Sequence, residues 1–425
     1  MMRRIEPYAR VEGAVKVPGD KSASHRALML SALAAGESTI EGLSPGLDVA
    51  GTGDIMEQLG ARRHHEADRV VVEGPAQGLR ASARPLQCGN SGTTMRLLSG
   101  IVSAVEGTHR LEGDASLSRR PMDRVAVPLG LMGARVLGEG PRVTPPLTIT
   151  GSRHLRGIDY HVPTASAQVK SALLLAGLFA EGPTVIHEDV RTRTTTEDML
   201  RRAGVEVRSV DAGTGRQVTL TPRRPDPAHW RVPTDPSQAA FFCVLGLIHR
   251  RGDVVVREVE NSPERIGFVS VLRRMGADLT ETPGVTGVDL HARSSGLHAT
   301  EVHAAEIPSV DEVPILSVAA AAAHGVSAFR DMGELRLKES DRFEGSMSLA
   351  RRLGCRVWSE GDDFFIEGLG GADAFTPFSV NAGLDHRIVM SSAVAGAAGR
   401  GCDIDGADTV QSSYPGFFDD LASLQ

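Results

Sequence analysis

The sequence predicts an α/β protein built from six repeats of about seventy residues each. Two series of recurring motifs and a set of unusually apolar helices carry this prediction. The first series is a helix end of the type Leu-x-x-Leu-Gly-Ala, followed by two short strands. Its glycines recur at intervals of 71 to 78 residues, at Gly60, Gly133, Gly204, Gly276 and Gly354. A glycine fits the residue just after a helix, because the left-handed backbone needed there disfavours a Cβ.

The second series consists of a polar turn, an apolar helix of small residues, a glycine and a strand rich in β-branched residues. Its six copies begin near Lys21, Asn90, Ser166, Pro236, Glu312 and Asp385. Each helix ends near a glycine, at Gly36, Gly107, Gly182, Gly252, Gly325 and Gly399. The sixth copy lacks its terminal hairpin after Leu421, and we expect residues 11–17 to supply the missing strand.

The helices of the second series are apolar on nearly every side. Residues 171–176, 319–323 and 391–398 contain almost only small or apolar side chains. Helices of this composition are expected to be buried rather than to cover a surface. Small side chains also allow neighbouring helices to approach closely, so we expect these helices to form the core of each group of repeats.

Composition excludes several classes of protein. With 46 Lys and Arg against 53 Asp and Glu, the net charge of -7 argues against a nucleic-acid partner. The longest apolar run falls short of the roughly 20 residues of a membrane span, and the N-terminus does not resemble a signal peptide. The four cysteines share no CxxC spacing, so neither a disulfide framework nor a metal site is expected. We therefore expect a cytoplasmic protein with no metal and no dissociable cofactor.

Cations lie at several of the predicted helix starts. Positive charge is unfavourable at the positive end of a helix dipole by about 0.3–1 kcal/mol unless an anion is near. The cations concerned are Lys21, Arg26, Arg96, Lys170 and Arg387. Together with free backbone amides they indicate an anion-binding site for a small ligand with several phosphate or carboxylate groups. The basic loops 116–122 and 190–194 add to this charge, whereas 336–342 alternates acid and base, as in a solvated helix face.

Seven motifs, taken in order, make the chain resemble the 5-enolpyruvylshikimate-3-phosphate (EPSP) synthase family from end to end. They are Gly-Asp-Lys-Ser at 19–22, Gly-Asn-Ser-Gly-Thr-Thr at 89–94, Arg-Pro-Met at 120–122, Ser-Ala-Gln at 166–168, Asp-Glu-x-Pro-Ile at 311–315, Lys-Glu-Ser-Asp-Arg at 338–342 and Asp-His-Arg at 385–387. The resemblance implies a two-lobed inside-out α/β barrel of six βαβαββ repeats, three per lobe. It places residues 1–18 and 235–425 in one lobe and residues 19–234 in the other, with the active site in the cleft between them.

The resemblance also implies an activity. Members of the family transfer the enolpyruvyl group of phosphoenolpyruvate to the 5-hydroxyl of shikimate 3-phosphate by addition and elimination, and release phosphate. The reaction belongs to the shikimate pathway, which leads to chorismate and the aromatic amino acids. By similarity Asp311 is the base near the 5-hydroxyl, Glu339 delivers and removes the methyl proton, and Lys21 stabilises developing charge. A monomer acting on these two small molecules is expected.

Binding residues follow from the same motifs. Those implied for phosphoenolpyruvate are Lys21, Gly92, Arg120, Gln168, Arg342 and Arg387. Those implied for shikimate 3-phosphate are Lys21, Ser22, Arg26, Ser166, Ala167, Gln168, Asp311 and Lys338. Asp48 and Asn90 are expected to support these residues. The chain departs from many relatives at Thr192, where they have serine, and at Ser412, where one branch has lysine. The herbicide glyphosate occupies the phosphoenolpyruvate site of the family and presses against the position of Gly92.

Two other functions compete with this interpretation. The sister enolpyruvyltransferase that acts on UDP-N-acetylglucosamine has a nucleophilic cysteine five residues before the arginine of an Arg-Pro pair, and here that residue is Ala115. A non-catalytic sensor of phosphorylated metabolites would be expected to have lost at least one of Lys21, Asp311 and Glu339, and all three are present. An enzyme is therefore favoured.

Overall fold

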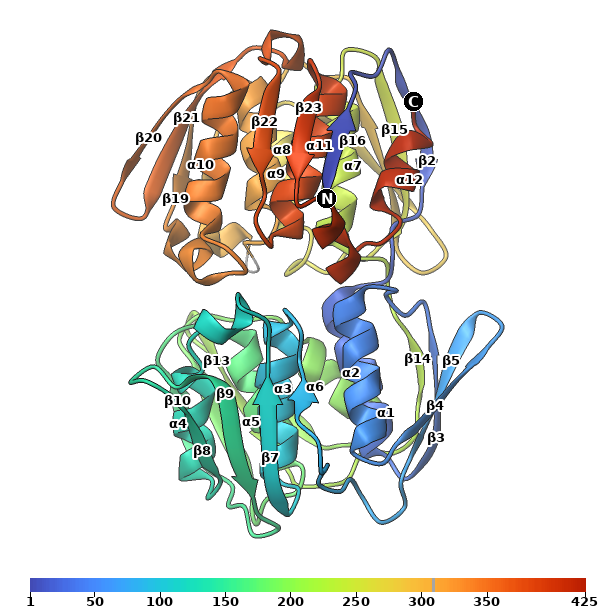
Figure 1. Cartoon of the computed structure of the whole chain (residues 1–425), viewed down its shortest axis with the longest axis vertical. Helices are drawn as coiled ribbons and strands as arrows, with labels where there is room; N and C mark the ends of the chain where they lie inside the picture. The colour runs from blue at the N-terminus through green and yellow to red at the C-terminus, as the bar shows by residue number, and fades with distance from the viewer. Residues whose placement is uncertain (308–309) are drawn as a thin grey trace. The chain divides into compact units, whose positions relative to one another are not determined.

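The computed structural model describes residues 1–307 and 310–425 (Figure 1). The chain divides into two compact units. Unit 1 consists of Met1–Asp20 and Pro233–Gln425, and unit 2 is the continuous segment Lys21–Val232. Each unit has its own hydrophobic core. The domain limits expected from the sequence, after residues 18 and 234, lie close to these boundaries.

Unit 2 contains three repeats, each with a sheet of four strands. Its helices are α1 (Lys21–Leu33), α2 (Leu47–Gln58), α3 (Gly92–Ser103), η1 (Leu117–Arg119), α4 (Asp123–Leu131), α5 (Ala167–Gly177) and α6 (Thr195–Arg202). Its strands are β3 (Gly36–Glu41), β4 (Arg62–Glu66), β5 (Arg69–Gly74), β6 (Leu86–Gln87), β7 (Gly107–Glu112), β8 (Arg135–Glu139), β9 (Thr144–Gly151), β10 (Asp159–Val162), β11 (Thr184–Glu188), β12 (Val207–Ala212), β13 (Gly215–Leu220) and β14 (His229–Arg231). The sheet orders are β14-β3-β5-β4, β6-β7-β9-β8 and β10-β11-β13-β12.

Unit 1 contains the other three repeats. Its helices are α7 (Pro236–Ile248), α8 (Gly267–Arg274), η2 (Ala304–Glu306), α9 (Val313–Ala322), η3 (Met332–Leu337), α10 (Arg342–Leu353), η4 (Ala372–Ala374), α11 (His386–Ala398), η5 (Ala407–Ser412) and α12 (Phe417–Ala422). Its strands are β1 (Met2–Ile5), β2 (Val11–Val15), β15 (Gly252–Val259), β16 (Asp278–Pro283), β17 (Val288–Arg293), β18 (Glu301–His303), β19 (His324–Arg330), β20 (Arg356–Glu360), β21 (Asp363–Leu369), β22 (Phe378–Asn381) and β23 (Cys402–Asp405). The sheet orders are β16-β17-β15-β2, β18-β19-β21-β20 and β1-β23-β22.

The first and fourth repeats exchange their leading strands. In the second, third and fifth repeats the leading strand pairs in parallel with the strand that follows the first helix of the same repeat. By contrast, β2 precedes α1 of the first repeat but pairs in parallel with β15 of the fourth. In turn, β14 precedes α7 of the fourth repeat but pairs in parallel with β3 of the first.

The prediction of which strand completes the sixth repeat is therefore wrong. Residues 11–17 contain β2, which belongs to the sheet of the fourth repeat. The sixth repeat is completed instead by β1, which runs antiparallel to β23. Antiparallel pairing at this edge is the arrangement that the last hairpin strand makes in the other repeats, so β1 takes the place of the missing hairpin.

The apolar helices lie at the centre of each unit, and Figure 1 shows sheets on the outside. In unit 1, α7, α9 and α11 pack against one another and all of their residues are buried. In unit 2, α3 packs closely against α5. A Cβ at Gly100 of α3 would lie 2.1 Å from the carbonyl oxygen of Ala172 of α5, so only glycine permits this approach. The prediction of buried small-residue helices is confirmed.

The glycines of the first motif series have the predicted left-handed backbone. Their φ angles are +113° for Gly60, +107° for Gly133, +76° for Gly204, +87° for Gly276 and +106° for Gly354. Each follows a helix and precedes a strand pair. The six sheets, three in each unit, confirm the predicted α/β repeat fold.

The two segments of unit 1 that adjoin unit 2 in the chain run side by side. The amide of Asp20 donates to the Pro233 carbonyl oxygen at 2.7 Å, and the amide of Asp235 donates to that of Pro18 at 2.9 Å. The buried side chain of Arg265 binds both Asp20 and Asp235. These contacts fix the backbone immediately before α1 and α7.

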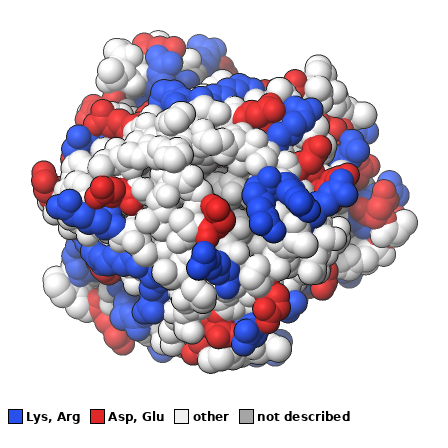
Figure 2. Space-filling model, turned by 90° about the horizontal axis from the view of Figure 1, so that it is seen from above, with Lys and Arg blue, Asp and Glu red and all other residues white. Residues whose placement is uncertain are grey.

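Charges on the surface are mixed. Figure 2 shows one face, on which Lys and Arg side chains are interspersed with Asp and Glu. Exposed ion pairs such as Arg4–Glu6 and Arg153–Glu106 also combine opposite charges on the surface of the protein. The face in Figure 2 therefore does not present the continuous basic surface that a nucleic-acid partner would need. Within residues 1–307 and 310–425, the structure has no helix with the length and apolar character of a membrane span.

Candidate active site

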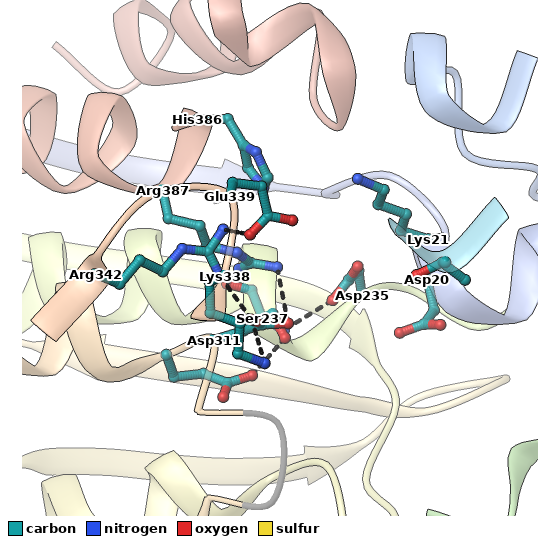
Figure 3. Close-up of polar contacts among 12 residues, drawn as sticks. Asp20, Lys21, Asp235, Ser237, Asp311, Lys338, Glu339, Arg342, His386 and Arg387 are labelled. Carbon is teal, nitrogen blue, oxygen red and sulfur yellow. Dashed lines mark hydrogen bonds and ion pairs between the residues drawn. The ribbon is translucent and has the colours of Figure 1, made fainter. Parts of the chain in front are cut away.

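Arg342 lies at the centre of a cluster of charged side chains in unit 1 (Figure 3). It is the first residue of α10, and its side chain is only 1% exposed. Its guanidinium binds Asp385 (Nε to Oδ2, 2.8 Å), Asp311 (Nη1 to Oδ1, 2.8 Å) and Glu339 (Nη2 to Oε2, 2.6 Å). A buried cation requires such partners, because a charge removed from water is otherwise costly. Arg342 therefore fixes the relative positions of three carboxylates.

Asp385 connects two segments of this cluster. It caps α11, where its Oδ1 accepts a hydrogen bond from the Arg387 amide at 2.9 Å. Its Oδ2 accepts one from the Ser340 hydroxyl at 2.8 Å. The carboxylate is fully buried, so Arg342 supplies the charge that keeps it there. Asp385 therefore anchors the segment 338–342 against the start of α11.

Asp311 lies among three cations. Its carboxylate is 2.8 Å from Arg342, 3.9 Å from Lys338 and 3.8 Å from Arg387. Burial alone would raise the pKa of Asp311, but the positive charges of Lys338, Arg387 and Arg342 outweigh burial and hold it well below its ordinary value. Asp311 is therefore ionised at all physiological pH values.

The low pKa of Asp311 predicts a defined pH dependence of stability. A carboxylate with a lowered pKa in the folded state contributes its full stabilisation above its ordinary pKa of 3.8 and loses it as pH falls through the folded value. We expect the difference in unfolding free energy between the wild type and Asp311→Asn to be constant from about pH 8 to pH 5 and to shrink below about pH 4. Urea unfolding over this pH series measures it, and a difference that grows on acidification would contradict the assignment.

Arg387 joins the starts of two helices of unit 1. Its Nη1 donates to the carbonyl oxygen of Ser237 in α7 at 3.3 Å, and its guanidinium lies 5.9 Å from the centre of the Phe241 ring. The Ser237 hydroxyl in turn binds the buried carboxylate of Glu312, the residue before α9. Neighbouring His386 contacts the Ser412 hydroxyl through Nδ1 at 3.3 Å. These contacts fix the starts of α7, α9 and α11 relative to one another.

In unit 2, the side chains at the start of α1 have partners on other helices. Lys21 forms an ion pair with Asp48 of α2. Arg26 is buried and donates from Nε to the Thr196 hydroxyl at 2.6 Å, from Nη2 to the Ser171 hydroxyl at 2.8 Å and from Nη1 to the Ser22 carbonyl oxygen at 2.9 Å. Arg26 is therefore held in one orientation by α5 and α6.

A second group in unit 2 surrounds Gly92, the first residue of α3. A Cβ at Gly92 would lie 3.0 Å from Arg96 Nη1 and 3.1 Å from Arg120 Nη1. Arg96 donates to the Gln168 amide oxygen at 2.7 Å, and Arg120 donates to the Asn90 amide oxygen at 2.6 Å. The start of α3 therefore lies between two guanidinium groups, an arrangement suited to a carboxylate or phosphate.

A model of the family "EPSP synthase (3-phosphoshikimate 1-carboxyvinyltransferase)" matches residues 5–421. The chain belongs to the EPSP synthase family. The chain is 43% identical to the 3-phosphoshikimate 1-carboxyvinyltransferase of Gluconobacter oxydans, over 97% of this chain and 95% of that protein. It is 42% identical to the protein of the same name from an Anaeromyxobacter strain, over 96% of this chain and 95% of that one.

Solved structures of EPSP synthases have the same fold. The Acinetobacter baumannii EPSP synthase is similar with a TM-score of 0.85 and 38% sequence identity, over all of this chain and 98% of that one. The enolpyruvyl transferase NikO of Streptomyces tendae is similar with a TM-score of 0.79 at 19% identity, which shows a shared fold alone. The predicted family and its two-lobed, six-repeat fold are confirmed.

The residues expected from the EPSP synthase motifs lie in one cluster in unit 1 and in two groups in unit 2. Unit 1 brings together Asp311, Lys338, Glu339, Arg342 and Arg387. In unit 2, the remaining expected residues lie in the first two turns of α1, at the starts of α3 and α5, and in the turn between η1 and α4; they are Lys21, Ser22, Arg26, Gly92, Arg120, Ser166, Ala167 and Gln168. Within the part of the chain that the structure describes, no cluster of His, Cys, Asp and Glu side chains is suited to a metal ion.

Two interpretations of charged residues are wrong. The segment 336–342 is not a solvated helix face, because Arg342 is buried and binds Asp385. Lys170 does not present its charge to a ligand, because its ammonium is fully buried between Glu188 and Glu197. Sequence reasoning missed both glutamates. The available signal was a lysine within an otherwise apolar helix, which requires a buried carboxylate elsewhere.

Proposed function

We propose that the protein transfers the enolpyruvyl group of phosphoenolpyruvate to the 5-hydroxyl of shikimate 3-phosphate, giving EPSP and phosphate. The match of residues 5–421 to the EPSP synthase family carries this proposal. The cluster on Arg342 supports it, since it brings three carboxylates and three cations close together. We also propose that the protein acts as a monomer in the cytoplasm.

Glu339 is the proton donor and acceptor in this proposal. The methylene carbon of phosphoenolpyruvate gains a proton as the 5-hydroxyl oxygen bonds to the adjacent carbon, which forms a tetrahedral intermediate. The same carboxylate then removes a proton from the methyl group as the C–O bond to phosphate breaks. A carboxyl group suits this exchange of roles. Glu339 is partly exposed, and its pairing with Arg342 fixes the direction of the carboxylate.

Asp311 is the base near the 5-hydroxyl. Its low pKa makes it a weak base, so the hydroxyl proton leaves as the new C–O bond forms, when that proton is most acidic. Before that step the ionised carboxylate accepts a hydrogen bond from the hydroxyl and orients it. Lys21 stabilises negative charge on the reacting groups, and its ion pair with Asp48 holds the ammonium in place.

The binding residues are proposed from the same motifs. Phosphoenolpyruvate binds Lys21, the Gly92 backbone, Arg120, Gln168, Arg342 and Arg387. Shikimate 3-phosphate binds Lys21, Ser22, Arg26, Ser166, the Ala167 backbone, Gln168, Asp311 and Lys338. Arginine suits these sites because its planar group forms two parallel hydrogen bonds with a carboxylate or phosphate.

Phosphate release tests the function directly. Purified protein mixed with shikimate 3-phosphate and phosphoenolpyruvate should release one phosphate for each EPSP formed, and neither substrate alone should support release. Replacing shikimate 3-phosphate with UDP-N-acetylglucosamine should abolish release. Burial raises the pKa of the Cys243, Cys355 and Cys402 thiols to about 12 each, so none of the three suits nucleophilic catalysis. Turnover with the nucleotide sugar would contradict the proposal.

Gly92→Ala should weaken inhibition by glyphosate much more than it weakens the use of phosphoenolpyruvate. The added methyl group would lie 3.0 Å from Arg96 Nη1 and 3.1 Å from Arg120 Nη1, so both guanidinium groups must shift slightly. A longer inhibitor at this position tolerates the loss of space less than the shorter substrate. We expect the inhibition constant to rise at least about tenfold, or 1.4 kcal/mol, with a smaller change in KM.

Steady-state kinetics at varied phosphoenolpyruvate and glyphosate measures both constants. Gly130→Ala is the matched control, because Gly130 lies on α4 with no atom within 4 Å of an added Cβ. Equal changes in both constants for Gly92→Ala would show that this position does not discriminate between the two ligands.

A further inference from the structure

Lys170 is a fully buried cation that holds three segments of unit 2 together. It is on α5, and its ammonium lies 2.8 Å from Glu188 Oε2 and 2.7 Å from Glu197 Oε1. It also donates to the Thr192 carbonyl oxygen at 3.4 Å. Glu188 ends β11, Thr192 is in the following loop and Glu197 is in the first turn of α6. One side chain therefore joins a strand end, a loop and a helix start.

The loop is held at Thr192 by two separate contacts. Its carbonyl oxygen accepts from Lys170, and its hydroxyl donates to Glu188 Oε1. Thr192 is buried, so its hydroxyl serves this internal cluster. The loop is thus fixed from within by the lysine and its two glutamates.

A gain in stability from packing does not by itself explain why these charged groups are buried. One ammonium and two carboxylates are removed from water, and the cost of desolvating them offsets much of their mutual attraction. Apolar side chains of similar size generally fill such a space at no loss of stability. Buried ionic groups do, however, fix the geometry of the segments that they join, since each requires a partner at a defined distance.

The residues next to this cluster hold Arg26. Ser171 follows Lys170 on α5, and Thr196 precedes Glu197 on α6. The two hydroxyls lie 2.6 Å apart, and both accept hydrogen bonds from the Arg26 guanidinium, at 2.8 and 2.6 Å. A shift of α6 relative to α5 would therefore separate the two oxygens and turn the guanidinium.

We infer that Lys170 is a positioning residue for the binding of shikimate 3-phosphate by Arg26. By pairing with Glu188 and Glu197 it fixes α6 against α5, and this holds Ser171 and Thr196 where they orient Arg26. The inference rests on the proposed function, in which Arg26 binds the substrate. Lys170 itself does not contact the ligand, because its side chain is fully buried.

Glu197→Gln is the variant that tests this role with the least disturbance. The amide keeps the shape of the side chain and leaves one ammonium paired with one carboxylate. We expect KM and the calorimetric Kd for shikimate 3-phosphate to rise severalfold, while KM for phosphoenolpyruvate and kcat change little.

Lys170→Met removes the cation and should raise Kd for shikimate 3-phosphate at least about tenfold, or 1.4 kcal/mol. A double-mutant cycle with Thr196→Val should be non-additive, because both changes act on Arg26.

Val72→Ala is the control, since Val72 is buried in β5 of the same unit and its truncation lowers stability without touching this cluster. If Glu197→Gln and Val72→Ala lower the melting temperature alike and neither changes the ratio of the two KM values, Lys170 has a structural role only and the inference is wrong. If Lys170→Met does not fold, Glu197→Gln and Thr196→Val decide alone. Absence of turnover by the wild type would instead overturn the proposed function.

Discussion

Replacing Glu339 with glutamine should lower kcat by about 10²–10⁴-fold, the usual contribution of a general acid–base group. The amide has nearly the shape of the carboxyl group and can still accept a hydrogen bond from Arg342, whose Nη2 lies 2.6 Å from Glu339 Oε2. It cannot deliver a proton to the methylene carbon or remove one. Steady-state turnover gives kcat, and calorimetry with shikimate 3-phosphate should show a Kd close to that of the wild type.

Glu344→Gln is the matched control for this prediction. Glu344 lies on α10, is 57% exposed and pairs with Arg351 on the surface. Its replacement should leave kcat unchanged. If Glu339→Gln retains more than about a tenth of the wild-type turnover, Glu339 is not the proton shuttle. A large rise in Kd for shikimate 3-phosphate would instead assign Glu339 to binding.

Arg342→Met should reduce the unfolding free energy of unit 1 by about 3–5 kcal/mol and abolish turnover. Removing the cation leaves Asp385, which is fully buried, without its charged partner. It also removes one of the three cations that keep the pKa of Asp311 low. Denaturant unfolding, followed by a probe in unit 1, measures the loss, and phosphate release measures turnover.

Arg351→Met provides the comparison on the same helix. Arg351 is 43% exposed, and surface ion pairs such as Arg351–Glu344 contribute about 0–1 kcal/mol. We expect its loss to fall within that range and turnover to be retained. Similar losses of stability in both variants would show that the buried cluster on Arg342 is not a special source of stability.

The sequence predicted the repeats because their features are local. The left-handed backbone just after a helix favours glycine, as at Gly354, and this requirement recurs at the same place in five of the repeats. The partner of a strand is not a local property. The segments that form β1 and β2 are both short, and no nearby residue indicates that one pairs with β23 and the other with β15.

The candidate site was predictable as a set of motifs and less so as a network. Alternating charges at 336–342 occur equally in a solvated helix and in a buried cluster, and the difference lies in a distant residue, Asp385. Lys170 illustrates the same limit. The sequence shows an unusual cation at a helix start. The carboxylates that pair with it, Glu188 and Glu197, are 18 and 27 residues further along the chain, on strand β11 and helix α6.

During synthesis, β1 and β2 are made long before their partner strands, because β1 pairs with β23 of the sixth repeat and β2 with β15 of the fourth. Ribosomes add about 5–20 residues per second, so Met2–Ile5 emerge roughly 20–80 s before β23 does. Unit 2, by contrast, is complete in the nascent chain once β14 has been made. Until β15 and β23 have been made, β2 and β1 lack these partner strands, and unpaired strand edges can pair with other chains. Arg3 and Arg4 within β1 supply the charge that discourages such pairing while the rest of unit 1 is being made.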